Sequence, residues 1–129
     1  MTTQSKSKKK LYGDLKPRLH SPWLKGKSRV DEVADFAAKI GQPLLKWQEL
    51  ILKDMLTVDK NNMFIRKSVL LLIARQSGKS HLARMRVLAG LFCFGEKDIL
   101  IMSSNRAMAL KSFNIMVDII ERNAFLCAQ

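Results

Sequence analysis

Hydrophobic side chains recur at intervals of three and four positions after residue 29. This spacing places them on one face of a helix and predicts a helix from Val30 to Ile40. Asp31 and Glu32 suit its first turn, and Gly41 is a stop signal. The apolar face comprises Val30, Val33, Ala34, Ala37 and Ile40.

A second amphipathic pattern starts at Pro43, a residue that suits the first turn of a helix. It runs to about Val58, where the sequence "DKNN" predicts a turn. One face of this expected helix holds Leu44, Trp47, Ile51 and Met55, with Leu45, Gln48 and Leu52 beside it.

Two uninterrupted apolar runs break with the helical spacing. They are "VLLLIA" (69–74) and "DILIMSS" (98–104), and continuous runs of this length are typical of parallel strands buried on both faces. Helical patterns follow each run, over 79–94 and from the capping residue Asn105 to 123. The inward positions expected of the last helix are Ala109, Phe113, Met116, Val117 and Ile120.

The order strand, helix, strand, helix predicts an α/β fold with a parallel sheet. A chain of 129 residues has room for one modest domain. We therefore expect a domain over 30–129, preceded by an irregular arm over 1–29 whose Pro17, Pro22, Gly13 and Gly26 disfavour regular structure.

Charge is distributed unevenly between these two parts. The chain has 23 Lys and Arg against 11 Asp and Glu, and residues 1–29 contain nine of the basic groups with Asp14 as their single acid. A polyanion such as nucleic acid fits this excess, because neutralising phosphates releases counterions. A solvated basic tail, with "QSKSKKK" as its clearest part, is the alternative.

No apolar run approaches the roughly 20 residues of a membrane span, and the Lys-rich start lacks the apolar stretch of a secretory signal. We therefore expect a cytoplasmic protein without a membrane partner. Cys93 and Cys127 lack metal-ligand spacing and lie in apolar helical patterns, which favours reduced, packed thiols.

The segment between the first apolar run and the next helix reads "RQSGKS". Main-chain N–H groups from about Gln76 to Ser80 can converge on an anion at a helix N-terminus. Gly78 permits close approach, Lys79 would reach the β- and γ-phosphates, and the Ser80 hydroxyl would bind Mg²⁺. The Walker A pattern is incomplete, because Ile73 stands where it requires glycine.

The sequence "ARQSGKS" (74–80) resembles the variant P-loop of the large terminase subunit of tailed bacteriophages. Three further blocks resemble that family: "PRLHSPWLKGKSRVDEVADFAAKIG" (17–41), "GQPLLKWQELIL" (41–52) and "ILIMSSNRAMALKSF" (99–113). The last block departs from the family, which has Gln where this chain has Met108. The resemblance extends from about Leu15 to Leu126.

The resemblance implies an incomplete RecA-like P-loop ATPase core, preceded by two helices and the basic arm. It also implies that ATP and Mg²⁺ are the cofactors. Lys79 and Arg75 become candidate catalytic residues, Arg75 by stabilising charge on the γ-phosphate, and Ser80 becomes the metal ligand. The implied nucleotide-binding residues are Trp47, Gln48, Arg75, Gln76, Ser77, Gly78, Lys79 and Ser80.

Two of these assignments have structural alternatives. Trp47 and Gln48 match the pair that contacts adenine in the family, although a Trp on an amphipathic helix is also a common core residue. Arg75 would otherwise form a surface salt bridge. His81 is not expected to act as a general base, since the family uses a glutamate from a later strand.

The acidic residues needed for phosphoryl transfer are not found after the second apolar run. Only Asp118 and Glu121 follow Ser104, and both lie in a helical pattern. The resemblance implies a Walker B Asp-Glu pair and a nuclease domain beyond this chain, so we expect an amino-terminal piece that does not hydrolyse ATP alone. Strands without pairing partners also predict marginal stability.

The resemblance implies double-stranded DNA, the portal protein and the small terminase subunit as partners in packaging viral DNA, and is compatible with a ring oligomer of the full-length protein. Two alternatives stay open. One is a different P-loop ATPase acting on nucleic acid, such as a helicase. The other is a non-catalytic DNA-binding protein whose basic arm binds and whose P-loop is vestigial.

Overall fold

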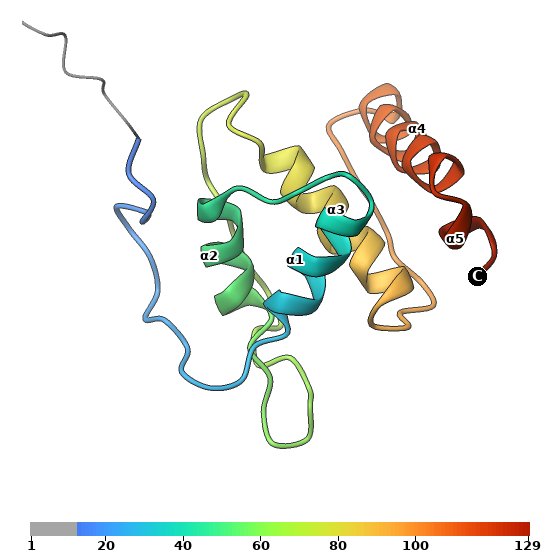
Figure 1. Cartoon of the computed structure of the whole chain (residues 1–129). Coiled ribbons are helices and arrows are strands. Elements are labelled where there is room, and N and C mark those ends of the chain that lie inside the picture. Colours follow the sequence, from blue (N-terminus) through green and yellow to red (C-terminus); the bar gives the residue numbers. More distant parts are fainter. Residues whose placement is uncertain (1–12) are drawn as a thin grey trace, which may run out of the picture.

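The computed structural model describes residues 13–129, which form five helices and connecting segments without regular structure. The helices are α1 (Val30–Lys39), α2 (Lys46–Met55), α3 (Lys79–Phe92), α4 (Arg106–Arg122) and α5 (Ala124–Cys127). Helix α3 is the central element, since it packs against α1 on one side and α4 on another (Figure 1). Helix α1 also packs against α2, and α5 follows at the end of α4.

Helix α1 confirms the prediction from the apolar spacing. Val33 and Ala37 are fully buried, and Phe36, on the same side, is buried as well. Gly41 ends the helix at a φ of 75°, where its N–H donates to the carbonyl of Ala38 and the N–H of Gln42 donates to the carbonyl of Ala37. This pair of hydrogen bonds is a Schellman motif, which satisfies carbonyls of the last turn.

Helix α2 starts at Lys46, three residues later than Pro43 predicted. The reason is a side-chain cap: the amide oxygen of Gln48 accepts the N–H of Leu45 at 2.8 Å. This bond satisfies a donor that has no helical partner and fixes the start of the helix. The helix ends at Met55, before the predicted Val58.

Helices α3 and α4 start where the sequence predicted. Asn105 caps α4, because its side-chain oxygen accepts the N–H of Met108 at 3.0 Å. Met116 is buried on α4 as expected, whereas Phe113 is 55% exposed and Ile119 takes an inward position instead. The short helix α5 was not predicted.

Side chains from all five helices and from the segment after α2 meet in one core. Fully burying a Val, Leu, Ile, Phe or Met side chain stabilises the fold by about 1.5–3 kcal/mol. The largest contributors include Val33, Phe36, Leu52, Leu56, Met85, Leu88, Met116, Ile119 and Leu126.

The prediction of a parallel sheet is wrong. Residues 13–129 contain no β-strand, so the fold is helical and lacks the sheet of a RecA-like core. Bridge pairs in this range join Ser28 to Thr57 and Val58 to Phe64, and both are antiparallel. The first joins the end of the arm to the segment after α2, and the second closes the loop that follows.

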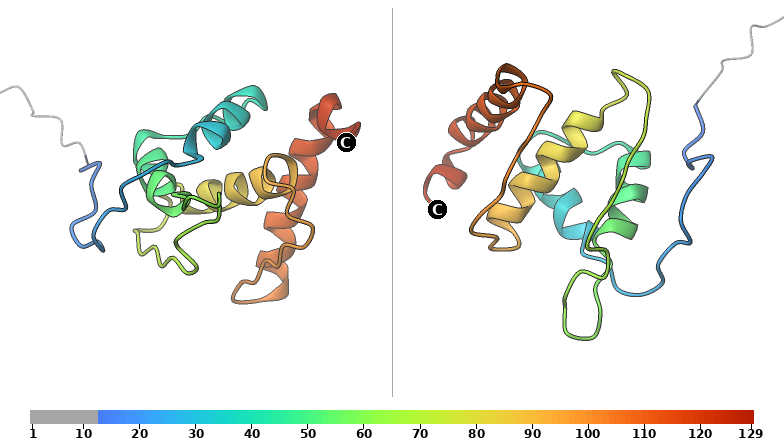
Figure 2. Two further views of the ribbon diagram at one scale, coloured as in Figure 1. Left: turned by 90° about the horizontal axis from the view of Figure 1, so that it is seen from below. Right: turned by 180° about the vertical axis from the view of Figure 1, so that it is seen from behind.

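The two apolar runs are extended but do not pair with each other. In Figures 1 and 2 the run over 69–74 passes along α2, whereas the run over 98–104 passes between α3 and α4. A parallel sheet requires two such segments to lie side by side and exchange main-chain hydrogen bonds. Their separation in space is the physical reason that no sheet forms.

Each run covers the helices with one face and exposes the other. Leu71 and Ile101 pack against the core, while their even-numbered neighbours point outward. The outward side chains are Leu70 (83% exposed), Leu72 (84%), Leu100 (83%) and Met102 (81%). The runs were expected to be buried on both faces, and only one face is covered within the described chain.

The described part of the arm, residues 13–29, forms no helix. Asp54 attaches it to the helices, because its carboxylate accepts the N–H of Leu24 at 2.7 Å and pairs with Arg66 at 2.9 Å. Arg66 donates in turn to the carbonyl of Pro22. The basic run "QSKSKKK" lies outside the described residues. Among helices α1 to α5, none has the length and apolar character to cross a bilayer.

Candidate functional site

The candidate phosphate loop turns sharply between the extended run and α3. Arg75 and Gln76 form a turn, Ser77 and Gly78 a bend, and α3 begins at Lys79. Gln76 has a φ of 59° and Gly78 a φ of 95°. The left-handed conformation of Gly78 is one that residues with a Cβ rarely adopt, so glycine permits the chain to enter the helix here.

Helix α2 holds this loop through Gln48. The side-chain nitrogen of Gln48 donates to the carbonyl oxygen of Gly78 at 2.8 Å, while its oxygen caps α2. Gln48 has no exposed surface, so both ends of its amide are satisfied by main-chain groups in a buried position. A Cβ on residue 78 would lie 2.9 Å from that nitrogen, which gives Gly78 a second reason to lack a side chain.

Two other residues border the loop. Trp47 is half-buried against the core, and its ring carbon Cζ2 lies 3.7 Å from the Cβ position of residue 78. The ring nitrogen Nε2 of His81 lies 3.3 Å from the carbonyl oxygen of Pro43, in the link between α1 and α2. The start of α3 is therefore braced by the segment that leads into α2.

A concavity of about 390 Å³ opens beside the loop. Its wall includes three cationic side chains, Arg75, Lys79 and Arg84, and no carboxylate. The complete lining is Ala74, Arg75, Gln76, Gly78, Lys79, Ser80, His81 and Arg84. An anion entering it would meet uncompensated positive charge.

The N-terminus of α3 adds to this positive field. The first main-chain bond of the helix joins the N–H of Leu82 to the carbonyl of Gly78, so the N–H groups of Lys79, Ser80 and His81 have no helical acceptor. The first turn of α3 also contains no acidic residue. Free N–H groups at a helix start favour phosphate.

The chemistry of the lining fits phosphate groups better than a tightly held metal. Lys79, Arg75 and the free N–H groups are donors for phosphate oxygens. Ser80 offers the one hydroxyl of the lining to Mg²⁺, an ion that commonly keeps several waters and binds through substrate phosphates. Within residues 13–129 no three His, Cys, Asp or Glu side chains gather into a metal site.

Five of the eight sequence-predicted site residues line the concavity: Arg75, Gln76, Gly78, Lys79 and Ser80. Ser77 lies in the same bend and is half-buried. Trp47 and Gln48 contact the loop from behind rather than lining the hollow. The sequence reasoning missed Arg84, whose position four residues after Ser80 on one helix face was the signal that could have identified it.

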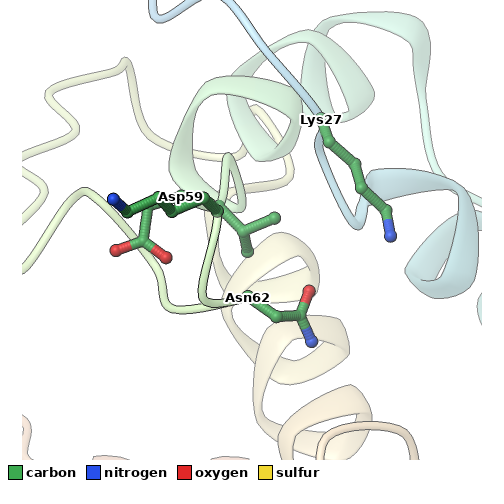
Figure 3. A pocket seen from close by; sticks show the side chains of 5 residues that line it. Lys27, Asp59 and Asn62 are labelled. Carbon is green, nitrogen blue, oxygen red and sulfur yellow. The ribbon is translucent and has the colours of Figure 1, made fainter.

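A second hollow of about 440 Å³ lies between the arm and the turn after α2 (Figure 3). Its lining residues are Lys27, Val58, Asp59, Lys60 and Asn62. The carboxylate of Asp59 accepts the N–H groups of Asn61 and Met63, so it shapes this turn. The Asp59 carboxylate is thereby hydrogen-bonded to the main chain, and the side chains of Lys27 and Lys60 are exposed to solvent.

No protein-family model, curated protein or solved structure matches the chain. The terminase resemblance is therefore supported by the sequence blocks quoted above, and the candidate site is supported by the geometry of its residues.

Proposed function

We propose that the loop over 75–80 binds the phosphates of ATP, and that the chain is the nucleotide-binding part of a terminase-like ATPase that packages double-stranded DNA. One observation carries the proposal. The residues of the P-loop-like sequence line a concavity at a helix N-terminus that contains three cations and no carboxylate. That combination is suited to a polyanion.

The lining residues would each bind a different part of ATP. The free N–H groups of α3 and the side chain of Lys79 bind phosphate oxygens, and Arg75 neutralises charge at the terminal phosphate. The Ser80 hydroxyl would help to hold Mg²⁺, which would screen the negative charge of the phosphates.

Trp47 is the better candidate of the adenine pair. Its ring is partly exposed beside the loop and could stack on a base, as aromatic side chains do. Gln48 would have to release two main-chain hydrogen bonds before it could reach a base. We assign Gln48 to holding the loop in place.

The proposal for this chain is binding without turnover. Hydrolysis needs a carboxylate that orients the attacking water and acids that help to hold Mg²⁺. The lining of the concavity contains neither. We expect no measurable ATP hydrolysis by the 129-residue chain on its own.

The packaging role is proposed from the terminase resemblance together with the basic arm. DNA, the portal protein and the small terminase subunit would be the partners, in the cytoplasm of the host cell. Lys16, Arg18 and Lys25 are exposed on the described part of the arm and would contact DNA phosphates.

Titration of the chain with a fluorescent ATP analogue tests the proposal. Lys79→Ala should weaken binding by about 10- to 100-fold, the range for losing a charge-assisted hydrogen bond. Lys97→Gln removes an exposed lysine outside the concavity and should leave the affinity within about twofold. Equal affinities of wild type and Lys79→Ala would contradict the proposal.

Lys79→Ala and a variant in which Lys16, Arg18 and Lys25 become Gln separate the two alternatives. A non-catalytic DNA-binding protein would lose DNA affinity when Lys16, Arg18 and Lys25 become Gln. It would not bind ATP, so Lys79→Ala would change neither ATP binding nor DNA binding. A helicase-like ATPase would bind ATP through Lys79 and prefer single-stranded DNA. Preference for double-stranded DNA together with Lys79-dependent ATP binding supports the packaging role.

A further inference from the structure

Arg84 occupies the second turn of α3 and lines the same concavity as Lys79 and Ser80. Ser80 and Arg84 are four residues apart, so they share one helix face. The rise of about 1.5 Å per residue places the Cα of Arg84 about 6 Å farther along the helix than that of Ser80. The positive wall thus extends from the loop along the helix.

The guanidinium of Arg84 differs from those of three other arginines in residues 13–129. Arg29, Arg66 and Arg86 form salt bridges with Glu32, Asp54 and Glu96. The Nε of Arg84 is instead buried and has no hydrogen-bond partner within the described chain.

A buried donor without an acceptor is costly, and native structures rarely leave one unsatisfied. Since the lining of the concavity contains no carboxylate, the protein supplies no anionic acceptor there for Arg84. The Arg84 guanidinium therefore has no anionic partner from the described chain, and the Arg84 side chain lines the wall where the proposed phosphates bind, so an acceptor for it would enter from outside.

We infer that Arg84 is a ligand-binding residue for the phosphate chain, and that it makes the site selective for polyphosphates over a single phosphate. The inference rests on the proposed function and adds a residue and a selectivity to it. A single phosphate on the free N–H groups of α3 reaches Lys79 and Ser80. A di- or triphosphate is long enough to reach Arg84 as well.

The experiment compares ATP, tripolyphosphate and inorganic phosphate as ligands of wild type, Arg84→Gln and Arg84→Lys. Arg84→Gln should lower the affinities for ATP and tripolyphosphate by about tenfold. It should leave the affinity for inorganic phosphate within about twofold of the wild-type value. Arg84→Lys should recover part of the loss, because it keeps the charge but not the planar donor set. Arg106→Gln, on the exposed start of α4, is the matched control and should behave as wild type.

Thermal unfolding without ligand separates binding from a structural role. Removing a donor that has no partner should leave the melting temperature of Arg84→Gln unchanged or raised, whereas an arginine needed for folding would lower it. A lowered melting temperature with unchanged ATP affinity would overturn the inference.

The remaining outcomes are distinct. If wild type binds ATP through Lys79 and Arg84→Gln binds it equally well, the inference on Arg84 fails and the proposed function stands. If Arg84→Gln lowers the affinity for inorganic phosphate as much as the affinity for ATP, the inferred selectivity for polyphosphates is wrong. If wild type binds neither ATP nor tripolyphosphate, the proposed function itself fails.

Discussion

The side-chain amide of Gln48 connects two helices by donating a hydrogen bond of 2.8 Å to the carbonyl oxygen of Gly78 while accepting one from the N–H of Leu45. The first bond fixes the residue that precedes α3, and the second fixes the start of α2. One buried side chain therefore sets the position of the candidate phosphate loop relative to the rest of the core.

Gln48→Ala should lower the free energy of unfolding by about 1–3 kcal/mol, because it leaves the Leu45 N–H and the Gly78 carbonyl without their partner in a buried place. It should also weaken ATP binding, since the loop loses its attachment to α2. Urea unfolding and ligand titration of the same samples measure the two effects.

Gln42→Ala is the matched control for Gln48→Ala. Gln42 lies in the link between α1 and α2 and is partly exposed, and its side chain has no hydrogen bond within residues 13–129. It should change the unfolding free energy by less than about 0.5 kcal/mol. Similar losses for the two variants would show that the bridge to Gly78 contributes nothing specific.

Gly78→Ala should be more destabilising than Gly41→Ala, although both residues have positive φ. Alanine in the left-handed region costs about 1–2 kcal/mol at either site. At Gly41 nothing lies within 4 Å of the new Cβ, whereas at Gly78 it would lie 2.9 Å from the Gln48 nitrogen and displace it. Denaturant unfolding of the two variants measures the difference.

A double mutant identifies the source of that difference. In a Gln48→Ala background the collision is removed, so Gly78→Ala should cost about as much as Gly41→Ala alone. Such non-additivity is expected for residues in contact. Strictly additive losses would mean that the Cβ of residue 78 does not act through Gln48.

The helices could be predicted from the sequence because their signals are local. The spacing of apolar residues predicted α1, and Asn105 was predicted to cap the last long helix and does cap α4. The start of α2 could not be located, because it depends on a bond from Gln48 rather than on the preference of Pro43 for a first turn.

The sheet was predicted wrongly because an apolar run does not encode the partner of a strand. The runs over 69–74 and 98–104 alternate between covered and exposed side chains, and they lie apart in space, one along α2 and the other between α3 and α4. Long-range placement of this kind depends on tertiary packing, which local patterns leave undetermined.

That the loop residues lie together could be predicted because they are contiguous. Five of them line one concavity, as the motif required. The role of Gln48 in holding the loop could not be predicted, since it depends on a contact across 30 residues of chain.

The outward faces of the two extended runs should tolerate polar residues. Leu70→Gln together with Leu72→Gln should change the unfolding free energy by less than about 0.5 kcal/mol, because both side chains are more than four-fifths exposed. The same change should reduce self-association, which exposed apolar patches promote. Chemical unfolding and sedimentation velocity measure these two quantities.

Leu71→Gln provides the comparison on the covered face. Leu71 packs against the core, so burying an amide there without a partner should cost about 1–3 kcal/mol. If the outward pair destabilised the chain as much as Leu71→Gln, the assignment of faces would be incorrect.

Asp54 should release the arm when it is protonated. Burial opposes ionisation of this carboxyl group, but hydrogen bonds from Arg66 and the Leu24 N–H outweigh burial and lower its pKa below the ordinary value of 3.8. An acid with a lowered pKa stabilises the folded state above its unfolded pKa, and this contribution is lost as the pH falls through the lower, folded value. The attachment should therefore persist at neutral pH and weaken only below about pH 4.

Amide hydrogen exchange at Leu24 measures this attachment, because its N–H donates directly to the Asp54 carboxylate. The protection factor, corrected for the intrinsic rate, should stay constant from pH 7 to about pH 4 and fall at lower pH. Asp54→Ala should abolish the protection already at neutral pH, whereas Asp35→Ala, at an exposed position on α1, should preserve it. Protection that survives in Asp54→Ala would show that the arm is held by contacts other than this carboxylate.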